Sequence, residues 1–466
     1  MKRLILLFLA IVLLTLSVSS CKKEDENEGN PIEVNTSEEY YLNTLQKGDY
    51  TFGEFQIATI DTNCVPAEIS ADATVIDQTL FERDGRLEEH FGIAISYHEI
   101  SVSDKGLSEM MLISQSQEAT TDLFIQEADN LMTLAINGYC SNLNAIDTLG
   151  LEKDWWSQMI NKQLTFKGAL YITAGPVSQW YYGAPIAMAF NKDMMTAFGV
   201  PDIYGLVQSG DWTLETLRKI CTEYGVYSEE EGRYAISYAN KVAQYALYVS
   251  AGGQFATVSD ERGIEVTLGN ENSVNIMNKI LLAFDPATSY GNTVSESAKI
   301  FTDSNALFWR ATVGYFETYL PSSTIDYGVI PCPKYDTVQK EYISCGWASS
   351  NFCVAIPNYL SGDRLAWSGL FTEAYSFLGY DMLKPVKYDS IVKYQVANDP
   401  IGSEMLDIIF GNVYFDINQI ANFGGSIDVV DNVLTGGLSA GRLGSAFGAI
   451  KELVDGDIAK YNTLVS

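Results

Sequence analysis

The sequence predicts an α/β protein built from two lobes. Short apolar runs typical of strands alternate with amphipathic helical segments along most of the chain, which is the order that builds a parallel sheet covered by helices. The chain has 466 residues, of which 47% are hydrophobic, and this exceeds what a single hydrophobic core normally holds. We therefore expect two lobes, each with a sheet of its own.

The first unit of this pattern runs over 50–97. A short apolar segment comes before a predicted helix over 73–91, whose apolar residues recur at three-, four- and seven-residue spacings. Ile93, Ile95 and Tyr97 then alternate with smaller or polar residues, as residues of a strand do. This unit predicts two parallel strands joined by a helix.

A second strand, Asp122–Ile125, leads into a helix that ends near Gly138. Gln126 and Asp129 lie just past the carboxyl end of this strand. Open α/β sheets bind their ligands at that end, so both residues are candidate ligand contacts.

The remaining elements follow the same alternation. The run Gly183–Phe190 is apolar without interruption, which is typical of a strand buried on both faces. Thr213 is placed to cap a helix, and the C-terminal third is predicted to be mostly helical. Further strands are predicted at 234–237, 306–309, 327–330 and 352–356, and a further helix at 243–250.

The N-terminus predicts export and a lipid anchor. Lys2 and Arg3 come before the apolar run Leu4–Leu14, and small residues stand directly before Cys21. This arrangement resembles a bacterial lipoprotein signal, so residues 1–20 are predicted to be removed and Cys21 to carry lipid. The alternative, a transmembrane anchor, would need roughly 20 apolar residues, and the run is shorter.

Residues 21–45 are predicted to form a flexible tether. The stretch after Cys21 is hydrophilic and offers no core-forming residue before Ile32 and Val34. Its acidic cluster also resembles the surface-export signals of some diderm lipoproteins. The protein is therefore expected in the cell envelope, on the periplasmic or the outer face of its membrane.

The charge of the chain narrows the classes of partner. It has 29 Lys and Arg against 59 Asp and Glu, a formal net charge of −30. Such a surface repels phosphate backbones and anionic headgroups, so nucleic acid and anionic substrates are not expected, and the only membrane contact expected is the lipid anchor. A neutral or cationic ligand suits this charge better.

Cysteine and histidine usage argues against metal sites. Apart from Cys21, the cysteines are scattered without the spacing of metal ligands. A disulfide from Cys332 to Cys345 or Cys353 and free buried thiols are both open. The two histidines leave little basis for histidine catalysis or zinc, so neither a metal nor another cofactor is expected.

A family resemblance appears at 182–217. The run Gly183–Phe190, then Asn191-Lys192-Asp193, and later Trp212-Thr-Leu-Glu-Thr-Leu, resembles the strand, Tyr/Phe-Asn-Lys-Asp and Trp-Glu-Glu-Leu signature of type 1 extracellular solute-binding proteins. These are the maltodextrin- and oligosaccharide-binding subunits of ABC importers. Other segments resemble landmarks of the family in the same order, so the resemblance covers about residues 50–460: 80–92, 155–156, 301–308, 327–336 and 403–409.

The resemblance implies a two-lobed periplasmic-binding-protein-like fold of type II, with hinge strands and a ligand cleft. Lobe 1 would hold 46–186 with about 345–400, and lobe 2 would hold 187–335 with about 401–466. The chain would cross between lobes near 184–190 and again between 331 and 350. The family closes over its ligand by hinge motion at such crossings.

Carbohydrate is held by aromatic rings that stack on its apolar faces and by planar polar groups that read its hydroxyls. Trp180, Tyr181 and Tyr182 come directly before the first crossing and are expected to overhang the cleft. Most other aromatics, including Trp155, Trp156 and Trp212, are expected to pack in the lobes. The further candidate ligand contacts are Trp347 at the second crossing, Asn240 and Gln244 after a lobe-2 strand, and Trp309 and Tyr315.

The function expected from the resemblance is capture of a neutral oligosaccharide, by a monomeric lipid-anchored protein, for delivery to the permease subunits of an ABC importer. Asn240 stands where the family often has an acidic residue, so the sugar itself is not specified. One alternative is a surface glycan-capture lipoprotein without a dedicated transporter. The other is a cell-surface hydrolase that uses a carboxylate pair, such as Asp211 with Glu215 or Asp399 with Glu404. The sequence contains no nucleophile-elbow, Walker or zinc-protease motif, and no catalytic residue is assigned.

Overall fold

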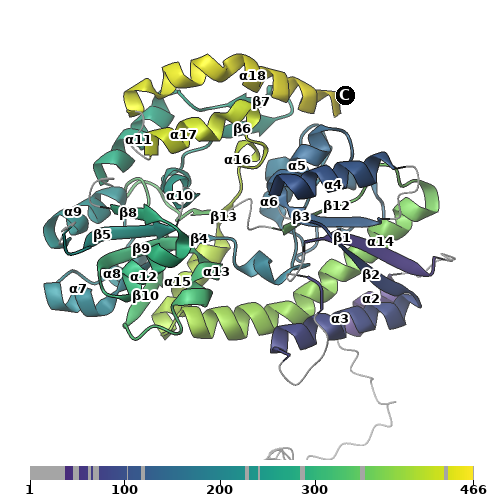
Figure 1. Cartoon of the computed structure of the whole chain (residues 1–466), viewed down its shortest axis with the longest axis horizontal. Helices are drawn as coiled ribbons and strands as arrows, with labels where there is room; N and C mark the ends of the chain where they lie inside the picture. The colour runs from purple at the N-terminus through teal and green to yellow at the C-terminus, as the bar shows by residue number, and fades with distance from the viewer. Residues whose placement is uncertain are drawn as a thin grey trace, which may run out of the picture. The chain divides into compact units, whose positions relative to one another are not determined.

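A computed structural model of the chain is shown in Figure 1. It describes residues 37–45, 52–60, 64–66, 73–101, 103–116, 121–225, 230–239, 242–283, 289–346, 352–434 and 439–464. The predicted signal peptide and Cys21 lie outside the described residues.

The chain divides into two units, Met1–Thr44 and Leu45–Ser466. Within the first unit the described residues form helix α2, Ser37–Thr44. This helix lies within residues 21–45, whose role as a tether stays a prediction.

The second unit contains two main sheets. The first has the strand order β12-β3-β1-β2, in which β1 runs parallel to β2 and β3, and β12 runs antiparallel to β3. Its strands are β1 Glu54–Thr59, β2 Ala94–Glu99, β3 Leu123–Glu127 and β12 Phe352–Ala355. Its helices are α3 Val75–Phe91, α4 Ser103–Gln115, α5 Ala128–Ile136, α6 Gln158–Leu164 and α14 Gly362–Leu378.

The second sheet has the order β10-β4-β9-β5-β8, with β4 antiparallel to both β9 and β10. Its strands are β4 Ile186–Asn191, β5 Tyr234–Ala239, β8 Ser289–Asn292, β9 Ala306–Thr312 and β10 Tyr327–Ile330. The helices between these strands are α7 Lys192–Phe198, α8 Ile203–Gln208, α9 Leu214–Tyr224, α10 Val242–Ser250, α11 Glu271–Ala283, α12 Val294–Thr302 and α13 Val313–Tyr319.

The chain passes from the first sheet to the second before β4 and returns before β12. A hairpin of β6 and β7, a two-stranded parallel ladder of β11 and β13, and the C-terminal helices complete the unit. Their bounds are β6 Ala256–Ser259, β7 Gly263–Val266, β11 Ser344–Cys345, β13 Val413–Tyr414, α15 Pro400–Gly411, α16 Ile417–Ala421, α17 Ser426–Leu434 and α18 Leu443–Leu464.

Local sequence signals explain where the predicted elements begin and end. Thr74 and Asp77 form a capping box at the start of α3, and Gly92 ends that helix in the left-handed conformation. Thr213 caps α9 by accepting a hydrogen bond from the Thr216 amide. These boundaries confirm the predicted 73–91 helix and the predicted cap.

One long helical segment lies in the C-terminal third of the chain, which was predicted to be mostly helical. Helix α14 continues without a break into η5, a π-helix over Gly379–Val396 that contains Pro385. Figure 1 shows it running from the side of α3 towards α13 and α15, and η5 contacts all three helices. Segments of π-helix are rare and are usually a single turn, so this one marks an unusual connection between the two sheets.

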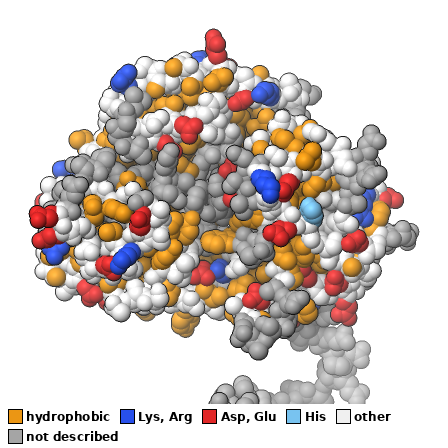
Figure 2. All heavy atoms as spheres, viewed as in Figure 1, with side chains coloured by type: hydrophobic (Ala, Val, Ile, Leu, Met, Phe, Trp, Pro, Cys, Tyr) orange, Lys and Arg blue, Asp and Glu red, His pale blue; other side chains and the backbone are white. Residues whose placement is uncertain are grey.

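The surface seen in Figure 2 agrees with the composition. Acidic side chains are scattered over this face, and Lys and Arg are fewer. Hydrophobic side chains are also present among them, as is normal for a folded surface.

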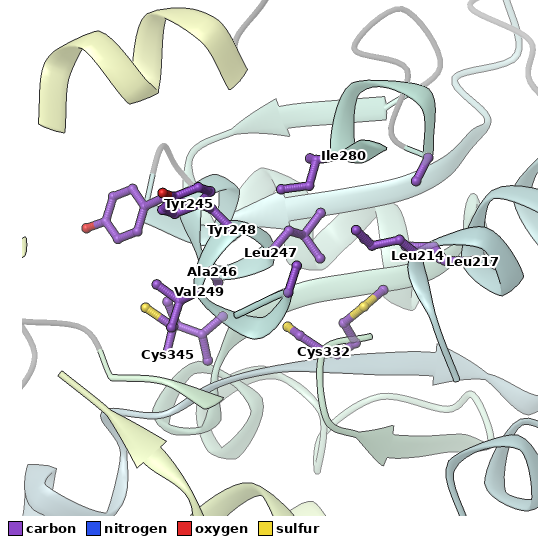
Figure 3. Packing of buried hydrophobic residues seen from close by; sticks show 14 of the residues in the cluster. Leu214, Leu217, Tyr245, Ala246, Leu247, Tyr248, Val249, Ile280, Cys332 and Cys345 are labelled. Carbon is purple, nitrogen blue, oxygen red and sulfur yellow. The ribbon is translucent and has the colours of Figure 1, made fainter. Parts of the chain in front are cut away.

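The core of the unit consists of several clusters, and the second sheet is buried on both faces. Every residue of β4 is buried, which confirms the prediction from its uninterrupted apolar run. Ile186, Met188 and Phe190 face one cluster, whereas Ala187 and Ala189 face another. Figure 3 shows part of the first of these clusters, where side chains of α9, α10 and α11 pack together with Cys332 and Cys345.

The C-terminal segment contacts the clusters of both sheets. Phe415, Ile417 and Tyr461 belong to the cluster beside the first sheet, whereas Val430 and Leu443 belong to a cluster beside the second. The predicted residue-by-residue division into lobes stays a prediction.

Candidate functional site

A short 3-10 helix, η2 (Gln179–Tyr182), lies between the two sheets in the sequence and leads into β4. The Ser178 side chain caps it by accepting a hydrogen bond from the Trp180 amide, 3.2 Å away. The tight turn places three successive aromatic side chains against cavities: Tyr181 and Tyr182 share one, Tyr181 also lines a second, and Trp180 lines a third.

Tyr181 marks the junction of the two sheets. It packs against the cluster beside the first sheet and also against a cluster beside the second. Burial raises the pKa of Tyr181 to about 12, and a hydrogen bond with Ser157 opposes part of this rise. The phenol therefore keeps its proton at physiological pH and can donate a hydrogen bond.

Two adjoining cavities meet at Tyr181, Phe410 and Gly411, and we call them together the junction groove. The first, of about 220 Å³, is lined by Trp156, Ser157, Gln158, Met159, Tyr181, Ala184, Pro185, Phe410, Gly411, Val413 and Phe415. The second, of about 330 Å³, is lined by Asp154, Pro176, Tyr181, Tyr182, Tyr380, Lys384, Tyr388, Asp407, Phe410 and Gly411. Together they have the size of a small-molecule pocket, for which about 300–1,000 Å³ is typical.

Aromatic rings form one wall of the second cavity. Tyr182 stacks on Tyr388 with ring centres 5.7 Å apart, and Phe410 meets Tyr388 edge-on at 4.7 Å. The Tyr388 hydroxyl donates to Asp407 Oδ1 at 3.0 Å, and Lys393 Nζ lies 2.7 Å from the same oxygen. Burial raises the pKa of both Tyr182 and Tyr388, so their hydroxyls are protonated.

The wall of the first cavity includes Trp156, which the sequence analysis had assigned to packing. Its indole Nε1 donates to Glu373 at 2.8 Å, and Trp155 Nε1 donates to the other oxygen of the same carboxylate at 2.9 Å. The Gly150 amide adds a third hydrogen bond to Glu373, at 2.9 Å. The sequence held no signal for this contact, because Glu373 lies on α14, far from the tryptophans in the chain.

Trp180 lines a third cavity, of about 250 Å³, with Gln179, Gly183, Gly314, Glu317, Thr318 and Lys387. Its ring lies close to two glycines: a Cβ atom at Gly314 would be 2.7 Å from Trp180 Cζ3, and one at Gly183 would be 3.1 Å from Cε3. Lys387 Nζ pairs with Glu317 at 2.6 Å beside it. The missing side chains of the two glycines therefore make room for the indole.

Gln126 and Asp129 lie at the predicted strand end, and their polar atoms are engaged there. Gln126 is buried, accepts from the Glu127 amide at 2.9 Å and donates to the Ser101 carbonyl at 3.4 Å. Asp129 accepts from the Asn130 amide at 2.9 Å. Among the described residues around the junction groove and the Trp180 cavity, neither is a lining residue.

Trp309 and Tyr315 lie in and beside the second sheet. Trp309 on β9 is fully buried in the cluster that faces α12 and α13, and its Nε1 donates to Ser297 Oγ at 3.2 Å. Tyr315 is partly buried against the same cluster. The packing of these rings follows from the position of β9 between two strands of a sheet covered on both faces.

Asn240 and Trp347 lie outside the described residues, and Gln244 belongs to α10 although its side chain is not described. The ligand role of all the candidate residues stays a prediction. The structure brings Trp180, Tyr181 and Tyr182 together with Trp156 and Phe410, which sequence reasoning had not selected.

The sequence left open whether Cys332 forms a disulfide with Cys345 or Cys353 or whether these thiols are free. The six cysteines of the described part are free, and five of them are buried: Cys64, Cys140, Cys332, Cys345 and Cys353. Burial raises their thiol pKa values, which keeps them unreactive. Over the same described ranges, no three His, Cys, Asp or Glu side chains are grouped to hold a metal ion.

The carboxylate pairs considered for hydrolysis are engaged in local structure. Asp399 caps α15 through the Gly402 amide and binds Lys192 at 2.5 Å and the Tyr204 hydroxyl at 2.9 Å. Burial acts to raise the pKa of Asp399, but these hydrogen bonds outweigh it and lower the pKa overall. Glu215 binds Arg218 in two hydrogen bonds, of 2.9 and 2.7 Å.

Comparisons with known proteins identify the fold. No family model matches the chain, and no curated protein matches it in sequence. Among solved structures, it is similar to UgpB from Mycobacterium tuberculosis, solved in complex with glycerophosphocholine, with a TM-score of 0.55 and 15% identity, over 88% of this chain and 99% of that one. The chain therefore has a two-lobed, periplasmic-binding-protein-like α/β fold, and at this identity the likeness establishes the fold alone.

Proposed function

We propose that this protein is an extracytoplasmic solute-binding protein that captures a neutral carbohydrate for an ABC importer. The observation that carries the proposal is the junction groove, which is lined by aromatic rings from η2, η5, α15 and the segment before α6. Its rings come from Trp156, Tyr181, Tyr182, Tyr388 and Phe410.

The chemistry of the groove suits a sugar. Aromatic faces stack on the apolar faces of pyranose rings, and protonated tyrosine hydroxyls with nearby carboxylates can pair with sugar hydroxyls. Asp154, Lys384 and Asp407 supply both signs of charge at the rim of the second cavity, which favours no strongly charged ligand. The fold supports the same role, because a ligand at the junction of two lobes can be enclosed when they close.

The proposal includes a lipid anchor at Cys21, which rests on the N-terminal sequence, and the maltodextrin-like subtype, which rests on the motifs at 183–217. It also includes permease subunits as partners and a monomeric state. UgpB was solved in complex with glycerophosphocholine, so glycerophosphocholine is one of the compounds to include in the screen.

The test is a thermal-shift screen of neutral oligosaccharides, cationic and anionic compounds and glycerophosphocholine, followed by calorimetry. A bound ligand stabilises the folded state by mass action, so a neutral sugar should raise the melting temperature. Tyr181→Ala should weaken binding of that sugar by roughly 1–3 kcal/mol, the scale of one desolvated aromatic contact. Tyr394→Ala removes an exposed tyrosine away from the groove and serves as the matched control.

Small-angle scattering with the same sugar should show a smaller radius of gyration than without it. Tight binding confined to a cationic or anionic compound would contradict the carbohydrate assignment. Cleavage of the oligosaccharide on incubation would favour the hydrolase alternative instead. The glycan-capture alternative shares the site, and loss of uptake on deleting a neighbouring permease would separate it from import.

A further inference from the structure

A separate pocket lies beside the second sheet, between the α8–α9 connection, the segment after β10 and the end of α15. It has a volume of about 570 Å³. Its walls include Gly210 and Asp211, then Lys334, Lys340, Glu341 and Tyr342, and finally Asn412. We call it the Lys334 pocket.

Lys334 is held rigidly in the wall of this pocket. Its amide donates to the Trp212 carbonyl at 3.1 Å, and its carbonyl accepts from the Leu214 amide at 2.8 Å. The residue is only 3% exposed. The backbone of Lys334 is therefore part of the framework, and its side chain has little freedom to leave the pocket.

The Lys334 ammonium points into the pocket. Nζ lies 5.0 Å from the ring centre of Tyr342, and a Cβ atom at Gly210 would lie 3.1 Å from it. Both Tyr342 and Gly210 are lining residues of the same pocket. The Lys334 ammonium therefore lies between the Tyr342 wall and the Gly210 wall of the pocket.

Within the described part of the chain, the Lys334 ammonium makes no hydrogen bond and no ion pair, and the Tyr342 ring is its only charge-stabilising contact. Asp211 accepts a hydrogen bond from Ser209 Oγ at 2.9 Å, and both Asp211 and Glu341 are exposed. The Lys334 side chain is largely buried, but its Nζ atom is open to the pocket, so its N–H groups and its charge are available to a group that enters there.

We infer that the Lys334 pocket binds the oxyanion of a small ligand, a carboxylate or a phosphate group. Lysine is a point-charge donor that suits both groups, and Lys340 supplies a second ammonium at the rim. The pocket adjoins the junction groove at Gly411 and otherwise has different walls, and the inference does not depend on the proposed carbohydrate role. The net charge of −30 by itself argues against binding of anions. The pocket would bind one through a local positive charge within this acidic surface.

The experiment uses the full-length chain purified in detergent, with inorganic phosphate and glucuronate as probes. Glucose is the neutral counterpart of glucuronate, and sodium chloride matches the ionic strength. Thermal shift and calorimetry should show that phosphate or glucuronate binds and that glucose has no effect at this site. The tighter of the two anions identifies whether the pocket prefers phosphate or carboxylate.

Lys334→Met keeps the shape of the side chain and removes its charge, and it should weaken anion binding about tenfold or more. Lys279→Met is the matched control, because Lys279 also lies over a tyrosine ring, that of Tyr335 at 3.8 Å, but does not line the pocket. It should leave anion affinity unchanged. Lys340→Met, at an exposed position that does not threaten folding, should weaken binding about threefold.

Two results would overturn the inference. One is that neither anion stabilises the wild-type protein beyond the chloride control, which would mean that water alone solvates Lys334. The other is that Lys334→Met and Lys340→Met both bind the anions as tightly as the wild type, which would place any anion elsewhere. Binding of neutral sugar at the junction groove would be unaffected by either outcome.

Discussion

At the scale of single residues, Glu373 holds part of the wall of the candidate site in place. It is a buried carboxylate on α14 that accepts hydrogen bonds from two indoles and one backbone amide of a distant segment. It thereby fixes Trp156, which forms part of the wall of the junction groove. A single side chain thus couples the packing of the first sheet to the shape of the site.

Replacing Glu373 by Leu should lower the free energy of unfolding by about 3 kcal/mol, because one buried and two partly buried N–H groups lose their acceptor. Glu373→Gln keeps one acceptor oxygen and should cost about half as much. Denaturant unfolding measures both effects. As a control, Glu215→Gln removes a half-exposed carboxylate that pairs with Arg218 and should cost less than about 1 kcal/mol. A Glu373→Leu variant as stable as this control would show that the indoles are satisfied without Glu373.

At the scale of elements, the side chain of Asp416 connects β6 to α16. Asp416 caps α16 through the Asn418 amide, at 2.8 Å, and accepts from the Phe255 amide at 2.8 Å and the Ala256 amide at 3.1 Å. Burial raises the pKa of Asp416 to about 6, while these amides act to lower it. The connection between the β6–β7 hairpin and α16 therefore depends on a carboxyl group, that of Asp416, which titrates near pH 6.

The pH dependence of stability follows from the sign of this shift. The unfolded chain binds this proton with a pKa near 3.8 and the folded chain with a pKa near 6, so the folded state holds the proton more tightly. The stabilisation is complete below the lower pKa and is lost as the pH rises through 6. The free energy of unfolding of the wild type, relative to Asp416→Asn, should fall by roughly 2 kcal/mol between pH 4 and pH 7.

Denaturant melts of both proteins across that pH range measure this difference. The comparison with Asp416→Asn cancels the titration of the other carboxylates, several of which, such as Asp399, have lowered pKa values and act in the opposite direction. A difference that rises with pH would mean that the amide donors dominate over burial at Asp416.

At the scale of the whole molecule, the chain combines an acidic folded unit with an N-terminus that predicts a lipid anchor. Among the helices that the structure describes, none has the length and apolar character needed to cross a bilayer. The lipid anchor at Cys21 stays a prediction from the N-terminal sequence.

Replacing Cys21 by Ser should release the protein from the membrane fraction, because the acceptor of the lipid is lost. Fractionation of cells with a carbonate wash measures this. Cys64→Ser changes a buried cysteine of the folded unit, so this variant and the wild type should both stay with the membrane. Retention of the Cys21→Ser protein after the wash would contradict the lipoprotein signal.

The sequence by itself determined the local elements and the class of fold. The β-α-β unit at 54–99, the strand β4 and the caps of α3 and α9 are all set by patterns within a few residues, such as apolar spacing and a threonine before a helix. The sequence also selected Tyr181 and Tyr182, because they come directly before the buried strand that begins the second sheet.

Only the tertiary structure decided which side chains share a cavity. Trp156 and Phe410 meet at one groove although about 250 residues separate them, and Trp309, similar to Trp180 in chemistry, is buried in the sheet instead. The same holds for Lys334, whose exposure depends on a loop, a strand end and a helix end from three parts of the chain. The physical reason is that periodicity reports which face of an element is apolar, whereas a site depends on which faces meet, and long-range packing alone determines that.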